Sequence, residues 1–395
     1  NELFYGLLEV YLPEYIFLSE KWKDLLPEYF EPVEYFRNHV LYRNTKGVRP
    51  ELHDDLALLL TTSGSTGSPK LVRLSYRNIQ SNAESIAEYL EITAEDRAIT
   101  TMPMSYTYGL SIINSHLIKG ATIITSELSL VERKFWDIVK NLKPTTFGGV
   151  PYIYEILKKL RFKQMLLPSL RYITQAGGKL SQELVEEFRD ICKEKGIRFI
   201  VMYGQTEATA RMSYLPYENS FEKSRSIGIA IPGGKFWIEN ENGEIIETSE
   251  TKGELVYQGE NVSLGYAESP ADFVKGDENN GILRTGDIAY RDADGFYYIV
   301  GRKKRFIKIF GNRVSLDETE SLLQSHFSDT NIACSGIDDK MYIFIVNELL
   351  KENIQKFLTE RTGLNTTAFK IVVIQVIPKN ESGKTIYTIL NRYHE

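Results

Sequence analysis

One stretch of the sequence, residues 170–208, constrains the fold more than any other. It reads as a short apolar strand that ends in the turn AGG (residues 176–178), a helix that begins after Ser181, and a second apolar strand that runs into YGQTE (residues 203–207). This order of elements predicts a βαβ unit in a largely parallel sheet. Ligands of such sheets bind at the carboxyl ends of the strands, so both polar turns are candidate site segments.

The rest of the pattern divides the chain into a large and a small domain, because 395 residues exceed the size at which one hydrophobic core stops growing. Strand-like runs at residues 56–60 and 71–75 and a helix that begins at Ser75 come first, and shorter β runs follow after about Ile227. The tail contains a helix that begins at Ser315 and strand-like runs at residues 341–346 and 371–378. We expect an α/β fold: a large domain with mostly parallel sheets and a β-rich subdomain (residues 1–303), then a small mobile α+β domain (residues 304–395).

Composition disfavours several classes of protein. The net charge of −6 argues against general binding of nucleic acid. Two cysteines far apart in sequence predict no disulfide framework and a reducing, cytoplasmic location, and the five histidines show no metal-ligand spacing. No apolar run is long enough to span a bilayer, so we expect no membrane span.

The segment TSGSTGSPK, residues 62–70, is a candidate anion-binding loop. Its glycines permit tight turns, and its hydroxyls stand beside backbone N–H groups, although such clusters also mark plain solvent loops. The usual phosphate loop of kinases does not fit, since Gly64 and Gly67 are too close together and no Gly-Lys pair follows. A near match at residues 378–385 has Pro378 in place of the first glycine, which disfavours a P-loop enzyme.

Five motifs follow one another along the chain: TSGSTGSPK, YGQTE, RTGD, GRKKRFIKIFG and ESGKT. Together they resemble the adenylate-forming superfamily of acyl-CoA synthetases, peptide-synthetase adenylation domains and luciferases, and they are most similar to the acyl-CoA ligases. The resemblance covers the chain from about Leu56 to its end. It implies that ATP and Mg²⁺ activate a small carboxylic acid to an acyl-adenylate with release of pyrophosphate, and that the acyl group then passes to the thiol of CoA. Because both reactants of the first step are anionic, such an enzyme needs positive charge and positioning.

The resemblance also implies roles for the residues of these motifs. The first loop would hold the β- and γ-phosphates, Gly177 and Gly178 would admit the adenine, and Tyr203 would stack on it. Thr206 would bind phosphate, Glu207 would coordinate Mg²⁺, Asp287 would bind the ribose, and Arg302 would assist at the phosphate or ribose. The complete set implied for ATP or AMP is Thr62, Ser63, Gly64, Ser65, Thr66, Gly67, Lys70, Gly177, Gly178, Tyr203, Gly204, Asp287 and Arg302.

Three lysines of the tail carry the remaining implied catalytic roles. Lys384, in ESGKT, matches the lysine that bridges the carboxylate and the α-phosphate in the transition state. Lys304 matches the hinge about which the small domain turns between the two half-reactions. Rotation would withdraw Lys384 and bring the segment that begins at Lys308 to the thiol-transfer site. The implied catalytic set is Lys384, Thr206, Glu207 and Lys308, while the basic run around Lys304 also fits an ordinary solvated surface.

The segment MPMSYTYGL, residues 102–110, resembles the family's wall of the acyl pocket, with Tyr106, Tyr108 and Gly109 as candidate lining residues. Because this segment supplies no charge to pair with a substrate ammonium, an α-amino acid is disfavoured. The tyrosines also fit ordinary core aromatics. The chain length, branching and aromaticity of the acid stay open.

Two departures from the family pattern affect the interpretation. Leu71 follows Lys70 where relatives usually have glycine, and the first motif lies so near the start that most of an amino-terminal subdomain is expected to be missing. Two alternatives to CoA ligation therefore remain open. One is delivery of the acyl group to the phosphopantetheine of an acyl carrier protein, and the other is nucleotide binding without turnover.

Overall fold

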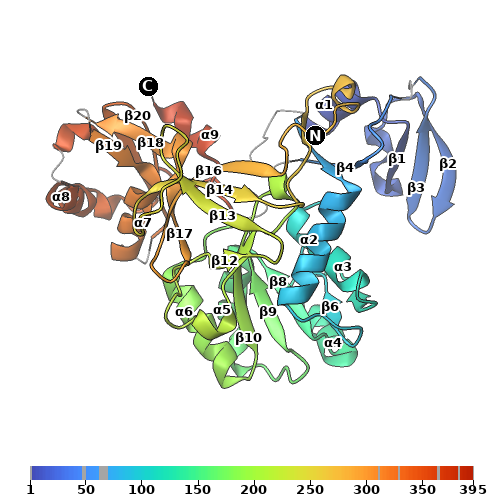
Figure 1. Ribbon diagram of the computed structural model, residues 1–395, viewed down its shortest axis with the longest axis horizontal. Helices are drawn as coiled ribbons and strands as arrows, with labels where there is room; N and C mark the ends of the chain where they lie inside the picture. Colours follow the sequence, from blue (N-terminus) through green and yellow to red (C-terminus); the bar gives the residue numbers. More distant parts are fainter. Residues whose placement is uncertain are drawn as a thin grey trace.

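The computed structural model describes residues 2–46, 50–61, 70–309, 312–327, 330–362, 365–380 and 383–394 (Figure 1). Its largest sheet has seven strands, and the five from β10 to β7 run parallel. The strand order is β12 (Ile229–Ala230), β11 (Ser213–Tyr214), β10 (Arg198–Tyr203), β9 (Tyr172–Gln175), β8 (Thr146–Gly149), β6 (Arg97–Ile99) and β7 (Thr122–Ile124).

Helices flank this sheet, as predicted for a βαβ architecture. In Figure 1, α2 and α3 lie on one side of it and α5 and α6 on the other. The Ser75 hydroxyl accepts from the Asn78 N–H, and the Ser181 hydroxyl accepts from the Leu184 N–H, so both predicted helix starts are confirmed. The helices are α2 (Tyr76–Tyr89), α3 (Thr107–Leu117), α4 (Arg133–Leu142), α5 (Pro151–Lys159) and α6 (Gln182–Glu194).

Two antiparallel sheets lie against the carboxyl ends of the parallel strands. The four-stranded one has the order β13 (Lys235–Glu239), β14 (Gly253–Gln258), β16 (Ile282–Arg291) and β17 (Tyr297–Arg302). The three-stranded one has the order β15 (Gly265–Ala267), β5 (Leu71–Ser75) and β4 (Leu56–Thr61). The two strands predicted before the first helix are therefore present, but they pair antiparallel with each other, outside the parallel sheet.

The amino-terminal residues form a small unit at the upper right of Figure 1. It has its own core around Leu8, Phe30 and Val40. Its elements are α1 (Glu2–Tyr11) and an antiparallel sheet with the order β1 (Tyr15–Ser19), β3 (His39–Asn44) and β2 (Phe30–Phe36).

The tail packs around cores of its own, formed entirely by residues after 306. The Ser315 hydroxyl accepts from the Glu318 N–H, which confirms the predicted helix start. The strand predicted over residues 371–378 ends earlier, at Val373, because its partner strand ends at Ile345. The elements are β18 (Phe306–Ile309), β19 (Asn312–Ser315), α7 (Leu316–His326), β20 (Ile332–Ile337), β21 (Lys340–Ile345), α8 (Lys351–Thr362), β22 (Phe369–Val373) and α9 (Tyr387–Leu390).

Two further expectations can be compared with the described part of the chain. None of its helices has the length and apolar character needed to cross a membrane. Cys192 and Cys334 are both buried as free thiols, in agreement with the prediction of no disulfide framework.

Candidate active site

A cavity of about 260 Å³ lies where the carboxyl ends of β9 and β10 meet the antiparallel strands and the tail. It brings together segments that are more than 200 residues apart in sequence, from α3 to the ESGKT motif. The predicted site residues that line it are Tyr106, Tyr108, Gly177, Gly204, Thr206, Glu207, Arg302 and Lys384.

The two turns predicted as site segments do meet at this cavity, and glycine is required in each. Gly177 has φ +81°, and a Cβ atom there would lie 2.5 Å from the Tyr106 hydroxyl. A Cβ atom on Gly204 would lie 1.7 Å from the Ala210 carbonyl oxygen. Side chains at these positions would push the turns apart, so the glycines allow the β9 and β10 ends to approach the neighbouring segments.

Glu207 faces the cavity beside an aromatic side chain that the sequence did not single out. The Tyr266 hydroxyl donates to Glu207 Oε1 over 2.9 Å. Lys70 Nζ lies 3.8 Å from the centre of the Tyr266 ring and 3.4 Å from a Glu268 carboxylate oxygen. Lys70 does not line the cavity itself, but Tyr266 connects the end of the predicted phosphate loop to Glu207.

Asp287 is almost completely buried behind the cavity wall, with 3% of its surface exposed. Its Oδ2 accepts from the Tyr203 hydroxyl at 2.5 Å and from Gln205 Nε2 at 2.9 Å, and its Oδ1 lies 3.2 Å from Arg302 Nε. Burial raises the pKa of Asp287, and the Arg302 charge opposes that shift. Tyr203 therefore uses its hydroxyl to hold Asp287, and its ring does not line the cavity.

Lys384 reaches the cavity from the tail and is held by its own turn. The Lys384 backbone N–H donates to Asn380 Oδ1, and the Lys384 carbonyl accepts from the Asn380 N–H, both over 2.9 Å. Burial lowers the pKa of Lys384, and the nearby Arg302 charge lowers it further, while Asp287 and Glu207 raise it. The ammonium thus stands in a partly desolvated site where an anion would be strongly attracted.

Two further predicted site residues do not line the cavity, and a third lines it with its hydroxyl already hydrogen-bonded to the chain. Gly109 does not line the cavity, because its position in the first turn of α3 faces the Pro103 carbonyl oxygen, 2.2 Å from an added Cβ atom. Gly178 lies against the Pro151 ring and is also outside the lining. Tyr108 lines the cavity, but its hydroxyl is engaged with the Thr174 carbonyl at 2.9 Å.

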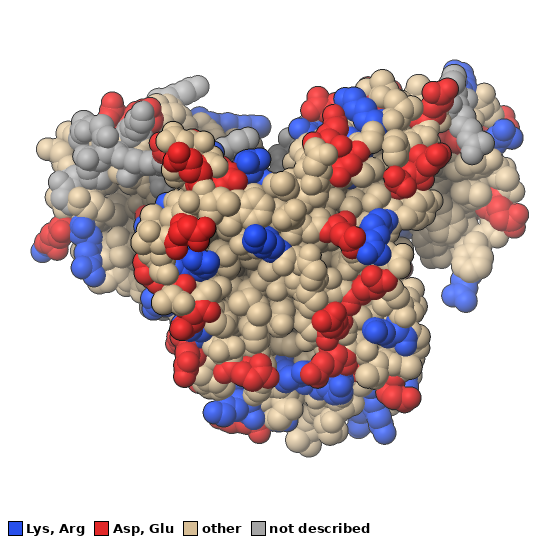
Figure 2. Space-filling view, in the orientation of Figure 1, with Lys and Arg blue, Asp and Glu red and all other residues tan. Residues whose placement is uncertain are grey.

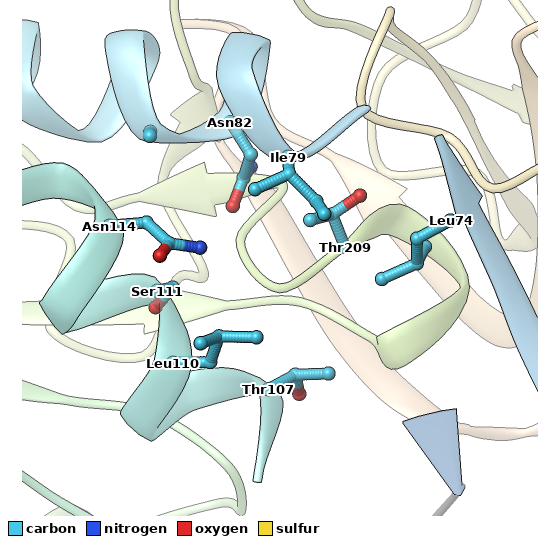
Figure 3. A pocket seen from close by; sticks show the side chains of 9 residues that line it. Leu74, Ile79, Asn82, Thr107, Leu110, Ser111, Asn114 and Thr209 are labelled. Carbon is cyan, nitrogen blue, oxygen red and sulfur yellow. The ribbon is translucent and has the colours of Figure 1, made fainter. Parts of the chain in front are cut away.

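A second, much smaller cavity lies behind Thr107, between α2 and α3 (Figure 3). The side chains of Asn82 and Asn114 point into it, and its volume is about 10 Å³. That is room for about one water molecule, so it is too small for a substrate.

Several predicted residues lie outside the described part of the structure. The first loop, residues 62–67, belongs to them, as do the side chains of Lys304 and Lys308. The backbone of Lys304 lies in a 3-10 turn (Lys303–Arg305), and that of Lys308 lies in β18.

The charges of the main cavity favour an anionic ligand. Among the described residues, the cationic side chains that line it are Arg211, Arg284, Arg302 and Lys384, and Glu207 is the one lining carboxylate. Arg284 and Arg302 are paired with Glu239 and Asp287 behind the lining, so the excess of positive charge comes from Arg211 and Lys384. Elsewhere, Figure 2 shows Lys and Arg interspersed with Asp and Glu over the displayed face. Among the described residues, no group of three or more His, Cys, Asp or Glu could hold a metal ion. Glu207 alone fits Mg²⁺ that is bound mainly through substrate phosphates, a common arrangement for this ion.

Comparison with known proteins decides the family. The model of the family "AMP-binding enzyme" matches residues 16–267, well over half of the chain. The chain belongs to the AMP-binding enzyme family. This confirms the predicted resemblance to adenylate-forming enzymes.

Curated relatives of this AMP-binding enzyme carry the names of CoA ligases. An oxalate–CoA ligase of Arabidopsis thaliana is 29% identical over 345 residues, which cover 84% of this chain and 66% of the relative. A 2-succinylbenzoate–CoA ligase of Bacillus licheniformis is 29% identical over 339 residues, which cover 84% of this chain and 69% of the relative. The chain thus spans about two thirds of the length of these relatives.

Known structures agree with the α/β architecture. An o-succinylbenzoate CoA synthetase from Bacillus subtilis, in complex with its acyl-adenylate intermediate, superimposes with a TM-score of 0.71 at 28% identity, covering 86% of this chain and 70% of that one. The same enzyme with ATP and a magnesium ion gives a TM-score of 0.71 at 27% identity, covering 88% and 73%.

Sequence reasoning missed several lining residues of this AMP-binding enzyme. Gln205 and Thr285 lie inside the recognised motifs YGQTE and RTGD, so their position was a usable signal. Tyr266 and Arg211 lie in no recognised motif. Arg211 adds a cation next to Tyr108, which agrees with the expectation that no negative charge beside this segment would pair with a substrate ammonium.

Proposed function

We propose that this chain uses ATP to activate a carboxylic acid and then transfers the acyl group to CoA. One observation carries the proposal: Lys384, from the tail, lines the same cavity as Thr206, Glu207 and Gly177 from the parallel sheet. A cation, a hydroxyl and a carboxylate that converge on one cavity suit a reaction between a carboxylate and a nucleoside triphosphate.

In the first step, a carboxylate oxygen forms a bond to the α-phosphorus, and the bond from that phosphorus to pyrophosphate breaks. Both partners are negatively charged, so repulsion between them contributes to the barrier. Lys384 and Arg302 stand at the cavity where they would neutralise that charge. Loss of one such group typically costs about 3–4 kcal/mol of transition-state stabilisation.

Each of the other segments would bind a different part of the nucleotide. Residues 62–67 and Lys70 would hold the β- and γ-phosphates, and Glu207 would hold Mg²⁺, which would supply positive charge to neutralise the phosphates. The turn at Gly177 would admit the adenine, and Asp287, fixed by Tyr203 and Gln205, would orient Arg302 toward the nucleotide. Direct contact of Asp287 with a ribose hydroxyl, which the resemblance implies, would require this carboxylate to emerge from the cavity wall, because it is 3% exposed and does not line the cavity.

In the second step, the thiol sulfur bonds to the acyl carbon, and the bond from that carbon to AMP breaks. We propose that the tail turns near Lys304 between the steps, with residues 1–303 and 304–395 as the two moving domains. Contacts that would have to break include the Lys252–Glu318 ion pair, with an N–O distance of 2.6 Å, and the hydrogen bond from the Arg302 backbone N–H to Asp317 Oδ2, at 2.8 Å. Lys252 is half-exposed, and such an ion pair contributes only about 0–1 kcal/mol.

CoA is the proposed acceptor because the relatives named above are CoA ligases. The acids in those names, oxalate and 2-succinylbenzoate, both carry two carboxylates. Acid-dependent exchange of pyrophosphate into ATP would test the first step, with Lys384→Ala as the disabled variant and exposed Lys379→Ala as its matched control.

We expect exchange that survives in Lys379→Ala and falls by a factor of roughly 10²–10³ in Lys384→Ala. Release of AMP on addition of CoA would then test the acceptor. If CoA causes no release of AMP, but a carrier protein that bears phosphopantetheine does, then the acceptor is the carrier protein and not CoA. Binding of ATP with no exchange for any acid would contradict turnover.

A further inference from the structure

Arg211 is a buried arginine in the wall of the candidate active site. It lies between β10 and β11, only 2% of its surface is exposed, and it lines the main cavity together with Tyr106 and Tyr108. Its carbonyl oxygen accepts from Asn82 Nδ2 at 2.8 Å and from Asn261 Nδ2 at 3.2 Å, which fixes the backbone from two sides.

The guanidinium of Arg211 has few hydrogen-bond partners among the described residues. Its two hydrogen bonds to described residues both come from Nη1, to the Tyr89 hydroxyl at 3.2 Å and to Met202 Sδ at 3.3 Å. Nε is buried without a partner among the described residues, and none of the ion pairs between them includes Arg211. Its remaining neighbour is the Tyr108 ring, with a centroid 5.0 Å away.

Arg73 is a second buried arginine of this chain, and its guanidinium has many partners. It is completely buried, and its guanidinium donates to the carbonyls of Tyr266 and Leu264, each at 3.0 Å. It also forms an ion pair with Glu278. Among the described residues Arg211 has no such set of partners, although an unpaired buried charge is costly.

We propose that Arg211 binds a second carboxylate of the acid, so that the substrate is a dicarboxylic acid. The first carboxylate would react beside Lys384, and the second would pair with Arg211, since both residues line the same cavity. A planar guanidinium offers parallel N–H donors that match a carboxylate. This inference rests on the proposed acid activation and specifies its substrate class.

The test compares acids that differ only in the second carboxylate: succinate with monomethyl succinate and butyrate, and phthalate with benzoate. Pyrophosphate exchange is measured for each acid on the wild type, on Arg211→Met and on Arg198→Met. Arg198 is the matched control, because it begins β10, the strand that precedes Arg211, but pairs at the surface with Glu91 at 2.8 Å. Thermal unfolding and ATP binding show whether each variant is folded.

We expect a wild-type kcat/KM for at least one diacid that is roughly 100-fold or more above that of its monoacid partner. Arg211→Met should abolish this preference while ATP binding persists, and Arg198→Met should keep it. Equal rates with monoacids, or a diacid preference that survives in folded Arg211→Met, would overturn the inference and leave acid activation standing.

A second readout keeps the inference testable if exchange fails. Calorimetric titration of the same acids in the presence of ATP measures binding without turnover. Diacid binding that is lost in folded Arg211→Met would support the inference even if the proposed activity were wrong. Absence of diacid binding to the wild type would overturn it.

Discussion

Arg302 links the two parts of the chain through Asp287 and Asp317. Asp287 and Arg302 are paired residues of the neighbouring strands β16 and β17, and Arg302 Nε lies 3.2 Å from Asp287 Oδ1. The Arg302 backbone N–H donates to Asp317 Oδ2 in the tail over 2.8 Å. The same arginine thus faces the cavity and contacts the first helix of the tail, which couples the position of the tail to the cavity.

Asp287→Asn should weaken ATP binding. The amide keeps the shape but removes the charge that holds Arg302, and hydrogen bonds to charged groups contribute about 1.5–3 kcal/mol. We expect the KM for ATP to rise roughly tenfold or more, with a smaller change in kcat. Steady-state kinetics beside Asp137→Asn, an exposed control on α4, would measure this. An unchanged KM would mean that Asp287 does not act at the nucleotide.

The rate of adenylation should fall at high pH because of Lys384. Burial and Arg302 lower the pKa of this lysine, and the protonated form is the one that would neutralise the reacting anions in the proposed first step. The kcat/KM for ATP, which reports on the free enzyme, should therefore be full at lower pH and decline as pH rises through the lowered pKa. In Lys384→Arg this decline should move to higher pH, because a guanidinium keeps its proton. A profile identical in both proteins would rule out Lys384 as its source.

His116 should make the fold sensitive to mild acid. Burial lowers the pKa of His116 from 6.5 to about 4, with a further contribution from Arg211. Between these values the unfolded chain binds more protons than the folded one, so the free energy of unfolding should fall as pH drops. The expected loss between pH 7 and 5 is about 2 kcal/mol.

His116→Gln would test this, since it removes the titrating group at the same site. Denaturant unfolding at pH 7 and pH 5 should show a smaller acid-induced loss in the variant, by about the same 2 kcal/mol. Equal losses in the variant and the wild type would show that other groups cause the acid sensitivity.

Gly204→Ala should destabilise the loop that carries Thr206 and Glu207. The added methyl group would lie 1.7 Å from the Ala210 carbonyl oxygen, which is backbone and cannot rotate away. Overpacking of this kind costs about 1–3 kcal/mol, so both thermal stability and exchange activity should fall. Gly6→Ala in α1 meets no atom within 4 Å and should be neutral or mildly stabilising. Wild-type behaviour of Gly204→Ala would contradict the tight packing of this loop.

Local signals in the sequence were sufficient for much of the fold. Serine caps at Ser75, Ser181 and Ser315 begin the predicted helices, and the βαβ unit ends in the two turns at the cavity. Strand pairing was harder to predict from the sequence, because alternation of apolar residues does not indicate which strand is the partner. That is why the antiparallel pairing of β4 with β5 and the early end of β22 were not predicted.

The motifs predicted several residues that line the cavity, but side chains outside the motifs were not predicted. Thr206, Glu207 and Lys384 come from recognised motifs and line one cavity. Arg211 could not be found this way, since a lone arginine in the sequence is usually exposed. Its burial, and the absence of a described carboxylate beside it, emerge only when α2, α3 and β10 are packed together.

The most direct test of acid activation follows oxygen from the acid into AMP. When the carboxylate is labelled with ¹⁸O, attack on the α-phosphorus and later cleavage of the acyl–oxygen bond by the thiol leave one labelled oxygen in AMP. We predict acid-dependent release of pyrophosphate and AMP that carries one ¹⁸O per turnover, detected by mass spectrometry. Formation of ADP, AMP without label, or no acid-dependent product would contradict the account.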